Sequence, residues 1–197
     1  LKVLHWFQQK CILKKVKLNL KLPLQKEKNI MIKERLRKPE TGIVKNQDIL
    51  ENQANIVFLA IGSNLGNKKR NIERSKFLLD QNSISIIKSS SIYETYSWPN
   101  HNKPKFFNIV IKVTTKLSPK NLFKVIKDIE KKMGRINTKI NSPRTCDIDI
   151  LDYNGLLYNN DKLIIPHPRI HNRNFVLFPL FEIEKNWNHP LKKNENS

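Results

Sequence analysis

The sequence has few cysteines and no long apolar run, and each shortage excludes a class of protein. Only 2 of the 197 residues are cysteines, Cys11 and Cys146. They stand far apart, so the sequence predicts neither a disulfide nor a zinc site. No run of about 18 uncharged apolar residues could span a membrane, and no convincing signal-peptide cleavage site follows the N-terminal residues. We therefore expect a soluble, cytoplasmic protein.

Glycine is scarce as well, with 5 residues in the whole chain. The glycine-rich signatures of P-loop NTPases and protein kinases are absent, so a bound nucleotide would not be held in a P-loop cradle. The stretch "IGSNLG" at residues 61–66 lacks the lysine and the full glycine spacing, and a tight turn is its simpler interpretation. Gly62, Gly66 and Gly134 lie at junctions between expected elements, which indicates positions where a side chain is not tolerated.

Acidic residues are outnumbered, with 17 Asp and Glu against 37 Lys and Arg, which gives a net charge of +20. Such an excess suits a binder of nucleic acid or of an anionic membrane. Most of it is lysine scattered among Asn and Ile rather than clustered arginine, so we favour a solvated basic surface. Residues 1–54 show neither a helical nor a strand period. We expect a basic, weakly ordered arm there, followed by one folded domain over residues 55–197.

Strand and helix signals alternate from Asn55 onward. The expected strands cover residues 55–61, 83–95, 105–115 and 146–153, and the expected helices cover residues 67–82 and 117–134. Ser118 and Pro119 suit the start of the second helix, and Gly134 suits its end. The order β-α-β-β-α-β predicts a ferredoxin-like α+β fold, an antiparallel sheet with packed helices. The apolar residues 174–183 add a C-terminal helical segment.

Two aspartates stand on alternate positions of the last expected strand, in the stretch "PRTCDIDI" at residues 143–150. Residues two apart on a strand point to the same side, so Asp147 and Asp149 share one face while Ile148 and Ile150 share the other. Two carboxylates on one face suit Mg²⁺, particularly when phosphates and waters complete its octahedral coordination. An exposed face of an edge strand would explain the same pattern.

Cationic side chains flank this aspartate pair in the sequence. Arg135 and Arg144 precede it, and the stretch "PHPRIHNRNF" follows with His167, Arg169, His171 and Arg173. Arginine suits phosphate because its planar guanidinium donates hydrogen bonds in pairs and stays charged. Together these residues predict a polyphosphate site, although a surface role remains open for each of them singly.

Several stretches together resemble a known family in order and spacing: "FLAIGSNLG", "IYET", "FFNIVIKV", "IEKKMGR", "PRTCDIDILDY" and "IPHPRIHNRNFVLFPLFEI". The chain resembles 6-hydroxymethyl-7,8-dihydropterin pyrophosphokinase of folate biosynthesis from about Ile56 to about Glu184. The resemblance implies a ferredoxin-like fold and an Mg²⁺-dependent enzyme. It also implies transfer of diphosphate from ATP, the co-substrate, to the hydroxymethyl group of the pterin, with release of AMP.

On the phosphate side, the resemblance implies that Asp147 and Asp149 hold two Mg²⁺ ions. Arg135 and Arg144 would belong to a loop that closes over the ATP phosphates and acts in catalysis. Further contacts to ATP are implied for Glu130, His167 and Arg173.

On the pterin side, the resemblance implies that Phe106 and Phe175 stack on the two faces of the ring. Asn108 and the backbone near Thr95 would read its polar edge. The residues themselves allow this, because they combine flat aromatic rings with an amide that can pair with a heterocycle.

The sequence departs from the family pattern in the loop after Arg135. Asn141 and Ser142 stand where many members have Trp and Gly, and Asn137 replaces a second arginine. On the preceding helix, Lys127 replaces a common Gln.

Two other functions remain open on the sequence alone. The element order and the positive charge also describe an RNA-recognition module, although "KFFNIVIKV" at residues 105–113 lacks the glycines of its signature. A metal-dependent nuclease could use the same two aspartates. We expect a monomer that binds pterin and ATP and neither nucleic acid nor membrane.

Overall fold

The computed structural model describes residues 54–97, 102–135 and 142–193. The predicted N-terminal arm therefore lies, apart from Ala54, outside the described residues. The loop departures at Asn137 and Asn141 also lie outside them. Among the described residues, no helix is long and apolar enough to cross a membrane.

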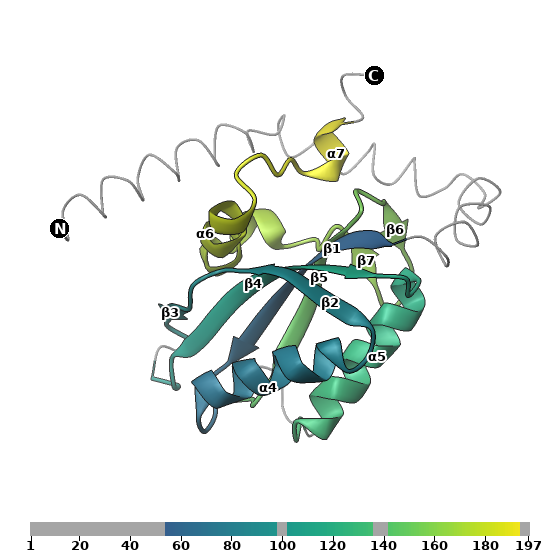
Figure 1. The fold of residues 1–197 in the computed structure, drawn as a ribbon. Helices are drawn as coiled ribbons and strands as arrows, with labels where there is room; N and C mark the ends of the chain where they lie inside the picture. Colours follow the sequence, from purple (N-terminus) through teal and green to yellow (C-terminus); the bar gives the residue numbers. More distant parts are fainter. Residues whose placement is uncertain (1–53, 98–101, 136–141, 194–197) are drawn as a thin grey trace, which may run out of the picture. The chain divides into compact units, whose positions relative to one another are not determined.

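The main sheet has four long strands: β1 (Asn55–Ser63), β2 (Ile84–Ser89), β4 (Phe106–Thr115) and β5 (Asp147–Tyr153). They lie in the order β2-β4-β1-β5, with every neighbouring pair antiparallel (Figure 1). The short strand β3 (Tyr93–Thr95) pairs with the first residues of β4. Helix α4 (Lys68–Asp80) connects β1 to β2, and helix α5 (Pro119–Lys132) connects β4 to β5. The predicted ferredoxin-like α+β order is confirmed.

The prediction of one continuous strand over residues 83–95 is wrong. The structure divides this stretch into β2 and β3, and Ser90 lies between them. The Ser90 hydroxyl accepts a hydrogen bond from the backbone N–H of Val110 at 3.0 Å, in place of a strand carbonyl. A side chain thus interrupts the ladder that the alternation of residues indicated.

Both helices begin where local signals predict. Asn67 and Ser118 cap α4 and α5, because their side-chain oxygens accept hydrogen bonds from the backbone N–H of Arg70 and Asn121. Gly134 follows α5 with φ of +85°, a left-handed conformation that glycine adopts without steric cost.

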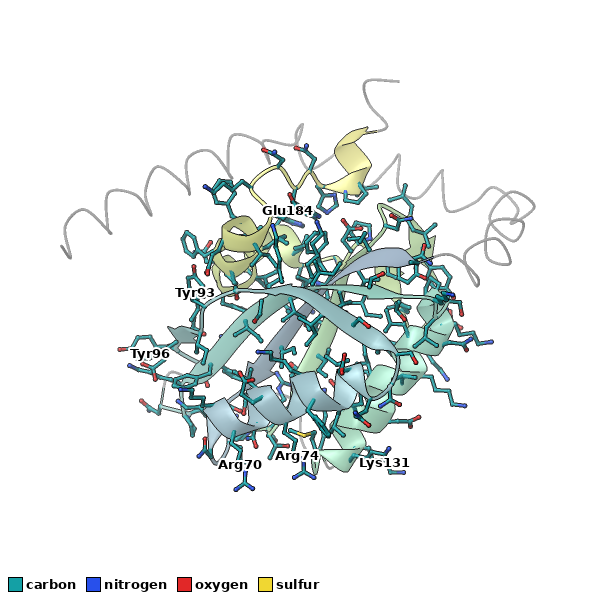
Figure 2. The ribbon with its side chains drawn as sticks, viewed as in Figure 1. Arg70, Arg74, Tyr93, Tyr96, Lys131 and Glu184 are labelled. Atoms are coloured by element: carbon teal, nitrogen blue, oxygen red, sulfur yellow. The ribbon has the colours of Figure 1, made fainter. Side chains whose placement is uncertain are left out.

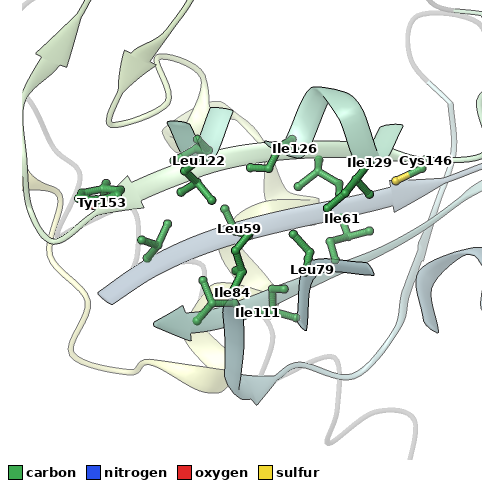
Figure 3. Packing of buried hydrophobic residues seen from close by; sticks show 14 of the residues in the cluster. Leu59, Ile61, Leu79, Ile84, Ile111, Leu122, Ile126, Ile129, Cys146 and Tyr153 are labelled. Carbon is green, nitrogen blue, oxygen red and sulfur yellow. The ribbon is translucent and has the colours of Figure 1, made fainter. Parts of the chain in front are cut away.

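The larger apolar core lies between the sheet and helices α4 and α5. Leu59 and Ile61 from β1 pack there with Leu122, Ile126 and Ile129 from α5 (Figure 3). All five side chains are essentially inaccessible to water. Truncating one such Leu or Ile to Ala typically costs about 2–5 kcal/mol of stability.

A second, smaller cluster lies on the opposite face of the sheet. Helix α6 (Asn174–Ile183) packs Val176 and Leu180 against Phe58, Val110 and Leu151 of the strands. Figure 1 shows α6 on the side of the sheet away from α4 and α5. The predicted C-terminal helical segment is thus confirmed, and it covers the face that the first two helices leave open.

Strand β5 contributes to both clusters. Successive side chains of a strand point to opposite faces, so Ile150 enters the larger core and Leu151 the smaller one. The pairing of β1 with β5 slips between Phe58 and Leu59, and Tyr153, two positions after Leu151, lies in the larger core. The remaining elements are the hairpin strands β6 (Tyr158–Asn159) and β7 (Ile164–Ile165), the 3₁₀ turn η2 (Ile170–Asn172) and the short helix α7 (Pro190–Lys193).

Candidate active site

Asp147 and Asp149 lie at the start of β5, on the face of the sheet that α6 partly covers. They pair in register with Gly62 and Ala60 of β1. Their side chains are 22% and 31% exposed, whereas Ile148 on the other face is 2% exposed. The predicted division of this strand into an acidic and an apolar face is therefore confirmed.

Two arginines hold the carboxylate of Asp147. Nη1 of Arg135 lies 2.7 Å from Oδ1, and Nη2 of Arg144 lies 3.2 Å from Oδ2. Burial alone would lower the pKa of Arg135, but the carboxylates of Asp147 and Glu130 outweigh it and raise the pKa above its ordinary value. Arg135 therefore stays charged beside the acidic pair.

Asp149 is held from the other direction by residues just before α6. Nη1 of Arg173 lies 2.8 Å from Oδ2 of Asp149, and Nε2 of His167 lies 3.6 Å from the same oxygen. Nδ1 of His167 accepts a hydrogen bond from the backbone N–H of Arg169 at 3.0 Å, which places the ring proton on Nε2. Burial lowers the pKa of His167 more than Asp149 raises it, so the neutral ring is favoured.

Glu130 is a buried carboxylate on α5, with 2% of its side chain exposed. It pairs with Arg135 and with Nζ of Lys127, the latter at 2.8 Å. It also accepts a hydrogen bond from the backbone N–H of Ile148 at 2.8 Å. Glu130 thus fixes Arg135 and the start of β5 together, and its predicted contact with ATP stays a prediction.

Gly62 separates the acidic pair from a group of predicted pterin-binding residues. It pairs with Asp147 on one side and with Asn108 of β4 on the other. A Cβ atom at Gly62 would lie 3.0 Å from Oδ1 of Asn108 and 3.6 Å from Cδ1 of Phe106. The absence of a side chain here keeps open the space between the carboxylates and these two residues.

The side chain of Asn108 has a defined orientation. Its Nδ2 donates a hydrogen bond to Oγ1 of Thr95 at 2.8 Å, while Oδ1 faces Gly62. Thr95 pairs with Phe106 across the β3–β4 ladder. The structure therefore brings Thr95, Phe106 and Asn108 together, next to the predicted phosphate site.

Each predicted stacking ring lies beside an arginine that pairs with one of the two aspartates. The guanidinium carbon of Arg144 lies 5.6 Å from the centroid of Phe106, and that of Arg173 lies 5.6 Å from the centroid of Phe175. Such distances are typical of cation–π contacts. The predicted aromatic residues and the predicted phosphate-side residues therefore lie next to one another.

The comparison with protein-family models bears on the functions that the sequence left open. The model of 7,8-dihydro-6-hydroxymethylpterin-pyrophosphokinase (HPPK) matches residues 58–185. The chain belongs to the HPPK family. This span includes every residue that the sequence analysis placed in the site.

Curated relatives agree with the family assignment. The chain is 46% identical over 136 residues to the folic acid synthesis protein FOL1 of Dictyostelium discoideum, covering 69% of this chain and 20% of that protein. It is 38% identical over 130 residues to 2-amino-4-hydroxy-6-hydroxymethyldihydropteridine pyrophosphokinase of Bacillus subtilis, covering 66% and 78%. The chain therefore spans about a fifth of the length of its FOL1 relative and most of the HPPK from Bacillus.

A solved structure shows the same fold. It is the Plasmodium falciparum HPPK-DHPS wild type with pterin and p-hydroxybenzoate, with a TM-score of 0.55 and 19% identity. The match covers 73% of this chain and 42% of that chain. At this identity the likeness bears on the fold, which agrees with the ferredoxin-like order.

Metal ligands other than the two aspartates do not gather here. Within residues 54–97, 102–135 and 142–193, no group of three or more His, Cys, Asp and Glu side chains could hold an ion. Two carboxylates on one face of a strand fit Mg²⁺ when phosphate oxygens and water supply the other ligands, as is usual in phosphoryl-transfer sites. The donor set is too small for an all-protein metal cage.

Asn64 lies beside the predicted site, and the sequence analysis took it only as part of a turn. It is 3% exposed, and its Oδ1 accepts a hydrogen bond from the backbone N–H of Arg144 at 2.8 Å. Its Nδ2 donates to Oγ of Ser97 at 3.4 Å and to the carbonyl of Pro104 at 3.3 Å. Asn64 thus joins the segment of Arg144 to the residues before β4. Its neighbours Ser63 and Asn67 are polar as well, so no sequence signal singles out Asn64 in this turn.

Proposed function

We propose that the chain transfers the diphosphate group of ATP to the hydroxymethyl oxygen of 6-hydroxymethyl-7,8-dihydropterin, with AMP as the second product. The observation that carries this proposal is the row of paired residues Asp147, Gly62 and Asn108 on one face of the sheet. It sets a carboxylate site and a heterocycle-binding amide side by side, with arginines around them. The family assignment supports the same reaction.

The bond changes are simple. The hydroxymethyl oxygen forms a bond to the β-phosphorus, the bond between that phosphorus and the oxygen bridging it to the α-phosphorus breaks, and the hydroxyl proton is released. AMP leaves with the bridging oxygen. Catalysis of such a transfer depends on alignment of the two reactants and on neutralising charge around the phosphorus.

Asp147 and Asp149 would hold the two Mg²⁺ ions, which neutralise phosphate charge when bound. Arg135 and Arg144 would bind phosphate oxygens, since guanidinium groups already surround Asp147 at 2.7 and 3.2 Å. His167 and Arg173, which approach Asp149 from the other side, would contact ATP there. Glu130 would act on the same nucleotide by holding Arg135 in place.

The pterin would lie over Gly62, where a side chain would obstruct it. Asn108 and Thr95 would hydrogen-bond its edge, because the bond between them leaves Oδ1 of Asn108 directed toward Gly62. Phe106 and Phe175 would cover its two faces and exclude water from the reacting oxygen.

The test is to supply ATP, Mg²⁺ and hydroxymethyl-dihydropterin and to measure AMP. We expect AMP in equal amount to the consumed pterin, and a fall of at least about 100-fold for Asp147→Ala. Release of ADP in place of AMP, or full turnover by Asp147→Ala, would contradict the proposal. The matched control is Asp128→Ala, which removes a carboxylate from α5 outside the site.

We further propose that residues 55–197 carry this activity and that residues 1–54 form a separate arm. A chain that starts at Met31 should then keep the activity of the full chain. Size-exclusion chromatography of both chains tests the predicted monomer, and the cytoplasmic location stays a prediction.

A further inference from the structure

A carboxylate on α6 ties that helix to the segment that leads into β3. Oε1 of Glu182 accepts hydrogen bonds from the backbone N–H and the hydroxyl of Ser91, both at 2.9 Å. Oε2 of Glu182 accepts a third hydrogen bond from the hydroxyl of Tyr93 at 2.8 Å. Figure 2 shows Tyr93 beside β3, on the side of the sheet where α6 lies. We name this three-bond contact the Glu182 tether.

One end of the Glu182 tether leads to a predicted stacking ring. Glu182 follows Phe175 by about two helical turns, so both residues lie on nearly the same side of α6. The apolar contacts of α6 with the sheet are not directional, whereas hydrogen bonds are. Anchoring Glu182 therefore fixes the rotation of α6 about its axis, and with it the direction of Phe175.

The other end of the tether leads to the polar edge of the predicted pterin site. Tyr93 and Thr95 are two residues apart on β3 and point to the same face. Tyr93 pairs in register with Asn108, and Thr95 accepts the hydrogen bond of that asparagine. The tether therefore joins the element that carries Phe175 to the element that carries Thr95.

The donor of the third bond keeps its proton over the working range of pH. Burial raises the pKa of Tyr93, and the hydrogen bond and negative charge of Glu182 raise it further, to about 12. The hydroxyl is neutral below this value and continues to donate to Glu182.

A second carboxylate, at the residue that follows α6, provides a contrast. Oε2 of Glu184 lies 2.6 Å from Nζ of Lys112 and ties the end of the helix to β4. This pair does not involve β3. Glu184→Ala is thus a matched control. It removes a carboxylate that ties the end of α6 to the sheet but is not linked to β3.

We propose that Glu182 is a positioning residue for pterin recognition, which sets the gap between Phe175 on α6 and Thr95 on β3 through Ser91 and Tyr93. This inference rests on the proposed function, because it names a residue that shapes the same site without touching the substrate.

The experiment compares Glu182→Ala with Glu184→Ala in the full chain. For each variant we would measure kcat, the KM for hydroxymethyl-dihydropterin, the KM for ATP and the thermal midpoint. Glu182→Ala should raise the pterin KM about 10-fold, as expected for the loss of charge-assisted hydrogen bonds, and change the ATP KM by less than about 2-fold. Glu184→Ala should leave both KM values near those of the wild type, with a similar change of thermal midpoint.

A double-mutant cycle with Tyr93→Phe shows whether the effect passes through the tether. Tyr93→Phe removes only the donor hydroxyl and should raise the pterin KM about 3-fold. Combined with Glu182→Ala it should add little, because both changes break the same contact. Tyr93→Phe alone also tests the tether if the Glu182→Ala protein does not fold.

The outcomes separate the two proposals. An equal pterin KM for Glu182→Ala and Glu184→Ala, a parallel rise of the ATP KM, or no effect of Tyr93→Phe would overturn the role of Glu182 while AMP formation by the wild type stands. Absence of AMP formation by the wild type would overturn the proposed function, and with it the inference.

Discussion

Asp147 and Asp149 lie on a strand whose other residues are all buried. An unpaired carboxylate there would be costly, but each aspartate meets at least one arginine within 3.2 Å. The surrounding positive charge therefore stabilises the acidic pair. At the scale of single residues, the two aspartates and their arginines, Arg135, Arg144 and Arg173, form one cluster of paired charges.

Gly62 offers a test at this scale. In Gly62→Ala the new Cβ would lie 3.0 Å from Oδ1 of Asn108, so either the amide moves or the space over Gly62 shrinks. We expect the pterin KM to rise about 10-fold, because the amide loses its alignment with the ligand. Steady-state kinetics against both substrates would measure it, and the ATP KM should change little.

Gly66→Ala is the control for that variant. Gly66 has φ of +63° and open space around its Cβ position, so alanine there is strained without touching the site. We expect a loss of about 1 kcal/mol in the free energy of unfolding and an unchanged pterin KM. A pterin KM raised equally in both variants would refute the role of Gly62 as a spacer.

At the scale of elements, Glu130 connects α5 to the start of β5 through Arg135 and the backbone N–H of Ile148. Glu130→Ala would remove the carboxylate that pairs with Arg135 and accepts a hydrogen bond from the backbone N–H of Ile148. Both donors are at least partly shielded from water, so the loss of this partner is costly. We expect a loss of about 2–4 kcal/mol in the free energy of unfolding, measured by urea denaturation.

Lys127→Ala breaks the other ion pair of Glu130 and is the matched comparison. The side chain of Lys127 is 41% exposed, so water screens this pair, and we expect a loss below about 1 kcal/mol. Equal losses for the two variants would contradict the view that Glu130 acts mainly through Arg135 and β5.

The elements that could be predicted are those with local signals. Ser118 and Gly134 mark the ends of α5, and the alternation of Asp147 with Ile148 marks the two faces of β5. The break between β2 and β3 was not predictable from periodicity. It depends on a hydrogen bond from the backbone N–H of Val110 to the hydroxyl of Ser90, and these two residues meet only in the folded sheet.

The same limit applies to the site. A strand period places Asp147 and Asp149 on one face, and the resemblance to HPPK supplied their partners. Contacts such as Arg173 with Asp149, or Glu182 with Tyr93, join residues far apart in the chain. Only the packing of α6 on the second face of the sheet brings them together, and no local pattern encodes that choice of face.

At the scale of the whole molecule, the chain has a net charge of +20, and the basic side chains of its described residues include two groups. Some cations surround the aspartates, whereas Arg70, Arg74 and Lys131 project outward from α4 and α5 (Figure 2). The outer group agrees with the solvated basic surface that the scattered lysines indicated.

The central claim is that the chain transfers two phosphoryl groups in one step from ATP to a pterin alcohol. The most direct measurement uses ATP labelled at the β-phosphorus, with Mg²⁺ and hydroxymethyl-dihydropterin, and follows the label by chromatography. The account predicts that the label leaves the nucleotide and appears in the pterin product, with unlabelled AMP. Label that stays in ADP, or that appears only in inorganic phosphate or diphosphate, would contradict it.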